Sequence, residues 1–304
     1  MRNNVIWKLS LFLIILVIAS FQPLDAQQTD RIQSDKIVVV FEKPFRSAAE
    51  EAFDIYPKIK ADLENAFGWE LKFRPTILLI NNHERFLQMT GNNLVVAYVI
   101  PHRSLMVIDY TRTNTDPFSL GSIMKHELSH LALHNRIREG KLPRWLDEGI
   151  SQWISDGIAE IITSRERSVF DGAVLSDKLF SLRSLSEDFP EDEESLLLAY
   201  EESKSFVEFI IHRFGRDGLL RVLKHLEAGN DIEEAVRKTF SLSFDQLERR
   251  WQSHLRKRTT WFTYLANNLY GFLFFFLALI TIGGFIRLVI KKRRYEDDEP
   301  SLDP

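Results

Sequence analysis

The segment from Asp116 to Gly149 reads DPFSLGSIMKHELSHLALHNRIREGKLPRWLDEG, and it determines how the second half of the chain is expected to fold. Asp116 is a capping residue type and Pro117 suits the first helical position, so a helix is predicted to begin there. The stretch from Gly140 to Pro143 interrupts the helical pattern and predicts a turn. A second helix is predicted from Trp145 to Asp156, folding back antiparallel against the first.

The residues before this segment predict a small sheet with one long helix. Short apolar runs rich in β-branched residues are typical of strands, and the apolar spacing from Phe45 to Phe67 is typical of a helix. The last two predicted strands are separated by Pro101 to Arg103, which predicts a hairpin. The predicted strands are Lys36–Phe41, Pro75–Ile80, Val95–Ile100 and Leu105–Ile108.

The residues after this segment predict more helices and complete the fold class. Apolar spacing predicts helices from Ser195 to Phe214, ending at Gly215, from Gly218 to Glu227 and from Asp231 to Phe240. The expected fold is therefore α+β, with a small mixed β-sheet lobe followed by a mainly helical lobe. No internal repeat is present.

The composition excludes several functions. The chain has 304 residues and a formal net charge of -4, so it lacks the basic field that nucleic-acid binding requires. It contains no cysteine, which excludes disulfides, iron–sulfur clusters and thiolate zinc sites. Any metal ion must therefore be bound by His, Asp or Glu.

The beginning of the chain is typical of a secretory signal peptide. Arg2 and Lys8 precede an apolar run from Leu9 to Phe21, and a short polar stretch ends at Ala26. We expect residues 1–26 to be the signal peptide. Leu24 is bulkier than the small residue usual at a cleavage site, so an uncleaved anchor is the alternative, and either segment would export the domain after it.

A second apolar segment lies near the end of the chain. Leu269 to Ile286 is an uncharged run of eighteen residues, long enough to predict a transmembrane helix over residues 269–290. Basic residues from Arg287 to Arg294 follow it, as expected on the cytoplasmic side. The sequence thus predicts a single-pass membrane protein with residues 27–260 outside the cytoplasm and a short cytoplasmic tail, residues 291–304.

The first predicted helix carries the motif H-E-x-x-H at residues 126–130. Histidines four residues apart lie on one face of a helix, so His126 and His130 can bind one zinc ion. Glu127 is then the expected general base, because it can hold a water molecule against the metal.

A catalytic zinc site needs a third protein ligand, and two nearby residues are candidates. His134 lies two helical turns from His126, roughly 11 Å along a straight helix, so it cannot share one small tetrahedral ion with both histidines. Glu148 lies on the next helix, which can fold back and present its carboxylate. We therefore predict a His126, His130 and Glu148 site with one open position, and a helix-end or outer-shell role for His134.

These residues resemble the gluzincin peptidases, specifically the bacterial peptidase MA-like family. The resemblance covers about half the chain and implies a zincin-like fold, a peptide or protein substrate, zinc held by the two histidines and the glutamate before glycine, and Glu127 as base. The stretches that carry it are His126–His130, Leu142–Gly149, Ala199–Ser203, Phe206–Val207, Phe214–Gly215 and, at the end of the region, Trp251.

The resemblance also suggests a residue for transition-state stabilisation. Related gluzincins place a phenol opposite the zinc, and Tyr200 is the candidate for that role. Tyr200 also falls on an apolar helical stripe with Leu196, Leu197 and Val207, so a buried core tyrosine is the alternative.

The expected activity is that of an endopeptidase. The Gly-Ala-Met-Glu-Asn segment of the related aminopeptidases has no counterpart upstream of His126. The hairpin from Val95 to Ile108 can instead offer its edge to an extended peptide. Two alternatives stay open: a catalytically inactive membrane-tethered scaffold with the peptidase fold, and a zinc-dependent deacylase that uses the same metal and base.

Overall fold

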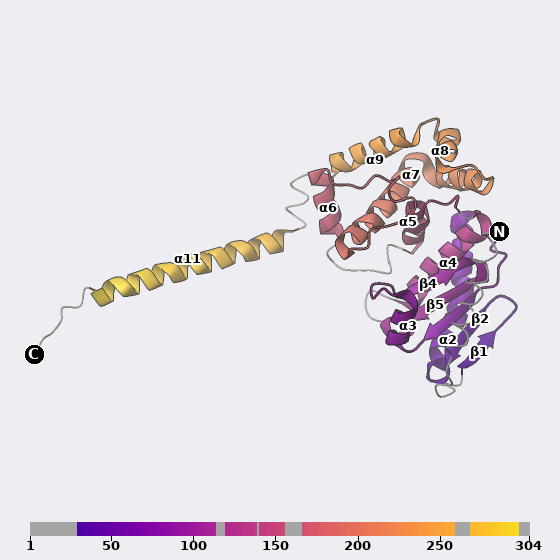
Figure 1. The fold of residues 1–304 in the computed structure, drawn as a ribbon, viewed down its shortest axis with the longest axis horizontal. Helices are drawn as coiled ribbons and strands as arrows, with labels where there is room; N and C mark the ends of the chain where they lie inside the picture. Colours follow the sequence, from indigo (N-terminus) through magenta and orange to yellow (C-terminus); the bar gives the residue numbers. More distant parts are fainter. Residues whose placement is uncertain (1–28, 114–118, 139, 156–165, 259–267, 298–304) are drawn as a thin grey trace, which may run out of the picture.

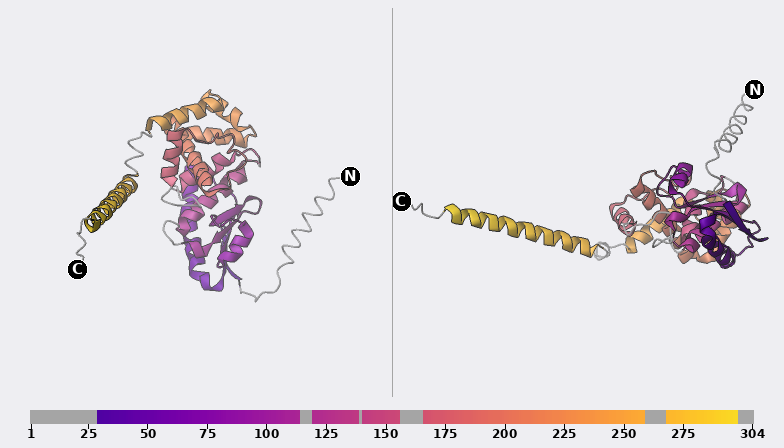
Figure 2. Two further views of the ribbon diagram at one scale, coloured as in Figure 1. Left: turned by 60° about the vertical axis from the view of Figure 1, so that its left-hand side comes forward. Right: turned by 90° about the horizontal axis from the view of Figure 1, so that it is seen from below.

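The computed structural model describes residues 29–113, 119–138, 140–155, 166–258 and 268–297. The described part contains a small sheet lobe followed by a mainly helical lobe, and one long separate helix near the C-terminus (Figures 1 and 2). This arrangement confirms the predicted α+β fold class. The predicted signal peptide, residues 1–26, lies outside the described residues.

The sheet is mixed and has five strands in the order β1-β2-β3-β5-β4. The pairs β1/β2 and β4/β5 are antiparallel, and the pairs β2/β3 and β3/β5 are parallel. The predicted hairpin is confirmed, because a short 3-10 turn at Pro101–Arg103 joins its two strands. The strands are β1 (Thr29–Gln33), β2 (Val38–Glu42), β3 (Thr76–Ile80), β4 (Ala97–Ile100) and β5 (Leu105–Asp109).

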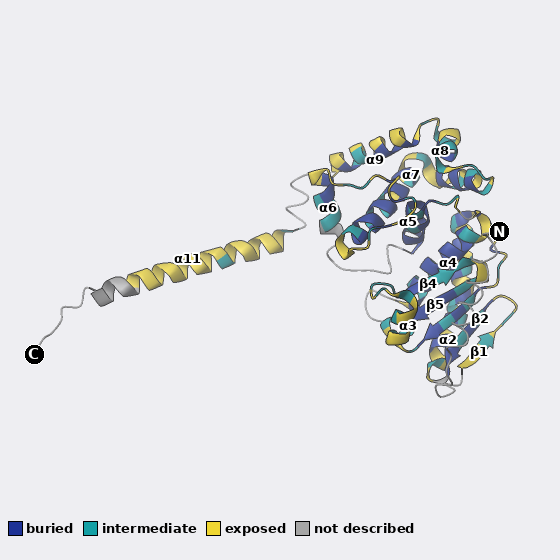
Figure 3. Cartoon of the chain, in the orientation of Figure 1, coloured by how far each residue is buried: buried dark blue, intermediate teal, exposed yellow. Residues whose placement is uncertain are grey.

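Helices cover both faces of the sheet. Alternate side chains of the strands, such as Val39, Ile77 and Ile108, are buried in the main core together with helices α2 (Arg46–Phe67) and α4 (Leu120–Arg136). The opposite face has a smaller apolar cluster beneath α3 (His83–Thr90). This layering places α4 beside the sheet, next to the edge strand β4. Figure 3 shows buried residues on both elements.

The start of α4 differs from the prediction. The helix begins at Leu120, and the Ser119 hydroxyl accepts a hydrogen bond from the backbone N–H of Ser122 at 3.1 Å. Ser119 is extended, with φ -90° and ψ 145°, so it provides the cap that was expected at Asp116. Asp116 and Pro117 lie outside the described residues.

The helical lobe follows the predicted order. Helix α5 (Arg144–Ile154) comes after the predicted turn, where Gly140 has φ 75°. Helix α7 (Glu193–Glu227) contains one residue with a non-helical backbone, Gly215. The first of the two helices predicted for this stretch was expected to end at that residue. The remaining helices of this lobe are α6 (Glu166–Ser176), α8 (Ile232–Phe240) and α9 (Phe244–Arg258).

Helix α11 (Leu269–Asp297) contains the segment predicted to cross a membrane. Its stretch from Leu269 to Lys291 is 23 residues long and apolar enough to span a bilayer. Its large apolar side chains, such as Phe274 and Phe285, are exposed. Because its apolar residues are exposed on every side, this helix suits a lipid environment.

Candidate active site

Helix α4 presents His126 and His130 from one buried face. Their side chains are one helical turn apart, with ring centroids 4.8 Å apart and the two Nε2 atoms at 3.2 Å. Both are buried, with exposed fractions of 2% and 6%. Glu127, which directly follows His126 on the helix, is also buried.

Helix α5 brings the carboxylate of Glu148 to the two histidines. Its Oε2 atom lies 3.9 Å from Nε2 of His126 and 3.6 Å from Nε2 of His130. Helix α5 reaches this position because it packs closely on α7 at Gly149, where an added Cβ atom would lie 2.4 Å from the backbone oxygen of Ser203. Glycine is thus required next to the candidate ligand.

Polar side chains of α5 and the residue after it hold the other ring nitrogens. His130 Nδ1 lies 2.8 Å from Asp147 Oδ1 and 3.2 Å from the Ser151 hydroxyl. His126 Nδ1 lies 3.4 Å from the hydroxyl of Ser155. Because the Nδ1 atoms are engaged in this way, the Nε2 atoms of both rings are the ones turned toward Glu148.

The three donor atoms fit a zinc ion. Their ligand atoms lie within 4.8 Å of one another. Tetrahedral zinc with bonds of about 2.0–2.2 Å needs donors roughly 3.4 Å apart, close to the 3.2, 3.6 and 3.9 Å spacings seen here. Two imidazoles and one carboxylate also leave a fourth position, as catalytic zinc sites do.

Asp147 links the site to His134. Its Oδ1 atom bonds to His130, and its Oδ2 atom lies 2.7 Å from Nε2 of His134. His134 therefore contacts the carboxylate behind His130 and does not join the three donor atoms, consistent with the helical geometry. Asp147 was not predicted as a site residue from the sequence. The sequence signal for it is that Asp147 directly precedes Glu148, on the helix predicted to fold back against the one that carries His130 and His134.

Electrostatics distinguish the two candidate ligand histidines. Burial lowers the pKa of His126 well below its ordinary value, and the neighbouring His130 lowers it further. Burial also disfavours charge on His130, but Asp147 and Glu148 outweigh burial and raise its pKa well above the ordinary value. Burial alone would raise the pKa of Asp147, yet His130 and His134 hold it well below its usual range. Asp147 is therefore a carboxylate at neutral pH.

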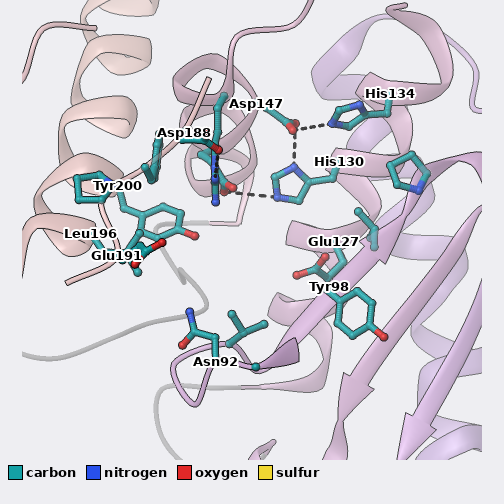
Figure 4. A pocket seen from close by; sticks show the side chains of 18 of the residues that line it. Asn92, Tyr98, Glu127, His130, His134, Asp147, Asp188, Glu191, Leu196 and Tyr200 are labelled. Carbon is teal, nitrogen blue, oxygen red and sulfur yellow. Dashed lines mark hydrogen bonds and ion pairs between the residues drawn. The ribbon is translucent and has the colours of Figure 1, made fainter. Parts of the chain in front are cut away.

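The candidate site opens into a cavity of about 1070 Å³. Glu127, His130 and Glu148 line it from α4 and α5, and Tyr98 and Val99 line it from the edge strand β4. The facing wall comes from α7 and the loop before it, which includes residues 188–191, and residues 91–93 before β4 also line the cavity (Figure 4). The cavity therefore lies between the sheet lobe and the helical lobe.

Tyr200 lies on α7 across this cavity from Glu127. Its side chain is buried and packs edge-on against Phe189, with ring centroids 5.2 Å apart. It also lines the cavity, and Figure 4 shows its hydroxyl pointing inward. Both sequence interpretations of Tyr200 thus describe part of its environment, since it is packed on one side and faces the cavity on the other.

The fold and the donor set together define a zincin-like protein of the gluzincin type, in which one helix carries both histidines and the next carries the glutamate. The family model of the Peptidase MA superfamily matches residues 97–257, from β4 to the end of α9. This match covers just over half of the chain, and the chain belongs to the Peptidase MA superfamily.

Two other proteins are similar to this chain. The uncharacterized protein YhcO of Bacillus subtilis (strain 168) is 23% identical over 142 residues, which cover 45% of this chain and 42% of YhcO. A crystal structure of a mutant M1 zinc metallopeptidase from Deinococcus radiodurans aligns with a TM-score of 0.43 and 14% identity, covering 73% of this chain and 51% of that one. The chain thus spans about half the length of each protein or less.

Proposed function

We propose that this chain is a zinc-dependent peptidase, anchored in a membrane by α11, that cleaves peptide bonds within extended polypeptides. The observation that carries the proposal is the convergence of His126, His130 and Glu148 around one point, with Glu127 beside them in a large cavity. Membership of the Peptidase MA superfamily supports the same reaction class.

In the proposed reaction, His126, His130 and Glu148 hold the zinc ion. A zinc ion bound there supplies Lewis acidity, which polarises a carbonyl group and makes water more acidic. Glu127 acts as general base: it takes a proton from the attacking water as the water oxygen bonds to the carbonyl carbon. Glu127 then gives that proton to the leaving nitrogen as the C–N bond breaks.

Two further side chains assist these steps. Asp147 fixes the ring of His130 through Nδ1, so that Nε2 stays directed at the metal position. The Tyr200 hydroxyl, on the opposite wall, donates a hydrogen bond to the carbonyl oxygen as that oxygen gains negative charge. These roles use a carboxylate, an imidazole and a phenol that already face one cavity.

The edge strand β4 supports a peptide as substrate. Within the described residues, β4 is the last strand of the sheet, and its residues Tyr98 and Val99 line the cavity. An extended peptide can add to such an edge through main-chain hydrogen bonds, which suits cleavage within a chain. A cavity of about 1070 Å³ exceeds the roughly 300–1,000 Å³ of small-molecule pockets and can take several residues.

We further propose a single-pass arrangement in the cell membrane. Residues 1–26 act as the signal peptide, residues 27–260 form the extracytoplasmic peptidase domain, residues 269–290 cross the membrane, and residues 291–304 form the cytoplasmic tail. The length of the apolar stretch in α11 and the basic residues after it support this arrangement.

A cleavage assay on the full chain in detergent tests the proposal. Zinc-loaded protein is incubated with casein and with a peptide library carrying blocked N-termini, and products are identified by mass spectrometry. We expect internal cleavage by the wild type and none by Glu127→Gln, which keeps its metal. Glu208→Gln, which changes an exposed carboxylate of α7 that does not line the cavity, should cleave normally. Equal cleavage by Glu127→Gln, or zinc-loaded wild type that cleaves no peptide, would contradict the proposal.

A further inference from the structure

A second cavity, of about 720 Å³, lies between α7 and α9, away from the candidate active site. Its lining residues contain no Asp or Glu. Cationic and imidazole side chains dominate it instead, and they are Arg213, Arg249, Arg250, Lys257, His212 and His254. We call this the basic cavity.

The two helices that form the basic cavity are fixed relative to each other. One face of α9 is buried in the core through Leu247, Trp251 and Leu255. The indole N–H of Trp251 donates a hydrogen bond to the Ser205 hydroxyl of α7 at 3.1 Å. The opposite face of α9 is exposed and carries the cavity's cations at helical spacing, so the charged wall is built on a rigid support.

The cations of the basic cavity differ from other arginines of the helical lobe. Arg183 and Arg256 form ion pairs with Asp245 and Asp177. Among the described residues, no ion pair within 4.0 Å joins a carboxylate to any of the four Arg and Lys side chains that line the basic cavity. Such a group of like charges repels itself and attracts anions.

His254 in the cavity reports the same positive field. The His254 ring lies 5.9 Å from that of His212 and 5.5 Å from that of Phe209. Partial burial lowers the pKa of His254, and the positive charges of Arg258, His212 and Lys257 lower it further. The electrostatic potential inside the basic cavity is therefore positive.

The position of the cavity along the chain points to the source of the anion. Helix α9 ends at Arg258, and the apolar helix begins at Leu269. The chain between them can span at most about 40 Å. Its sequence includes Trp261 and Tyr264, residue types that are enriched at membrane interfaces. The basic cavity is thus tethered close to phospholipid headgroups.

We propose that the basic cavity binds the phosphate of an anionic phospholipid headgroup in the membrane that anchors the chain. Arg249, Arg250 and Lys257 from α9, with Arg213 from α7, are the phosphate-binding groups. Binding would hold the peptidase lobe against the membrane surface in one orientation. The inference rests on the anchoring by α11 in the proposed function, and it does not depend on catalysis.

Lipid binding to the full chain in neutral detergent tests the inference. Phosphatidylglycerol or phosphatidylcholine is titrated into the micelles, and retained lipids are counted by native mass spectrometry. We expect tighter binding of phosphatidylglycerol and about a tenfold or larger weakening in the Arg249→Gln/Arg250→Gln/Lys257→Gln variant, because each basic group near a headgroup contributes to affinity. The basic residues that follow the span, from Arg287 onward, are the same in every protein compared.

The control removes the same charge elsewhere on the lobe. Arg216, Arg221 and Lys224 are exposed on α7 and do not line the basic cavity, so the Arg216→Gln/Arg221→Gln/Lys224→Gln variant should bind phosphatidylglycerol as the wild type does. Equal losses in both triple variants would overturn the inference in favour of a general positive field. No loss in the Arg249→Gln/Arg250→Gln/Lys257→Gln variant would also overturn it.

Two further experiments are needed. One distinguishes a lipid phosphate from a free phosphate ion, and the other tests the membrane anchor by itself. If inorganic phosphate displaces phosphatidylglycerol at equal concentration, the cavity binds a free anion, and the proposal of lipid binding is overturned. Extraction of cell membranes with alkaline carbonate tests the anchor. Release of the chain would contradict the membrane anchoring by α11 and with it the lipid binding by the basic cavity. Unchanged lipid binding by Glu127→Gln is expected, because that substitution leaves the basic cavity intact.

Discussion

Asp147 lies between two histidines of α4, with its carboxylate 2.8 Å from Nδ1 of His130 and 2.7 Å from Nε2 of His134. This one buried side chain of α5 thereby joins α5 to α4 and also fixes the ring orientation of His130, a candidate zinc ligand. Carboxylates behind ligand histidines raise ligand basicity and limit ring rotation, so they contribute to metal affinity.

Asp147→Ala should weaken zinc binding about 10–100-fold, because His130 loses its orienting partner. Competition with a zinc indicator on the full chain measures the change. Asp188→Ala, which removes an exposed carboxylate at the same cavity, should leave zinc affinity unchanged. Equal affinity in Asp147→Ala and the wild type would show that the contact does not orient a ligand.

Tyr200→Phe tests the phenol. Phenylalanine keeps the ring packing against Phe189, so stability and zinc content should stay near those of the wild type. Loss of a hydrogen bond to the transition state should lower kcat about 10²–10³-fold with little change in KM. Tyr98→Phe, on the opposite wall, is the control. A normal kcat in Tyr200→Phe would leave Tyr200 as a packing residue only.

Gly149→Ala should destabilise the fold. Its Cβ atom would meet the Ser203 backbone oxygen at 2.4 Å, so α5 and α7 must move apart, at a cost of about 1–3 kcal/mol or more. Thermal and urea unfolding measure the loss. Gly121→Ala is the matched helical control: its added Cβ atom would lie 3.6 Å from Ile55, an ordinary contact, and should be neutral or stabilising. Similar stabilities for the two variants would contradict the packing argument.

Glu202 predicts a pH dependence of stability. Burial raises its pKa to about 8, although a hydrogen bond from the Phe180 N–H opposes this and Glu248 adds to it. The folded state thus keeps a proton that the unfolded chain releases near pH 4.5. Between these values the unfolded state binds fewer protons, so stability should fall as pH rises, by up to about 1.4 kcal/mol per unit.

The Glu202→Gln variant should lose this slope. Glutamine keeps an acceptor for the Phe180 N–H and cannot ionise, so urea unfolding between about pH 5.5 and 7.5 should show a flatter profile. Glu208→Gln, an exposed change on the same helix, should keep the wild-type slope. A wild-type slope in Glu202→Gln would show that another group binds the proton.

The sequence predicted the elements with strong periodicity and those bounded by glycine. The break at Gly215 and the hairpin at Pro101–Arg103 follow from local residue types, so they could be predicted from the sequence. Strand β1 was not predicted, because the polar stretch Thr29–Gln33 is a strand only through its pairing with β2. The start of α4 was misplaced because two capping residues, Asp116 and Ser119, lie close together in the sequence.

The candidate site was predictable where spacing alone sets geometry. His126 and His130 share a helix face, and the short turn after α4 limits where Glu148 can lie. Asp147 was missed because its role depends on the rotation of α5, which close packing at Gly149 sets. The basic cavity was missed for a similar reason, since its cations come from α7 and α9, far apart in sequence.

The zinc content of the purified full chain tests the central claim most directly. Elemental mass spectrometry after zinc loading and removal of free metal should give about one zinc ion per chain for the wild type and Glu191→Ala, and almost none for Glu148→Ala. Circular dichroism confirms that each protein is folded. A folded wild type without bound zinc, or Glu148→Ala with full zinc content, would contradict the account.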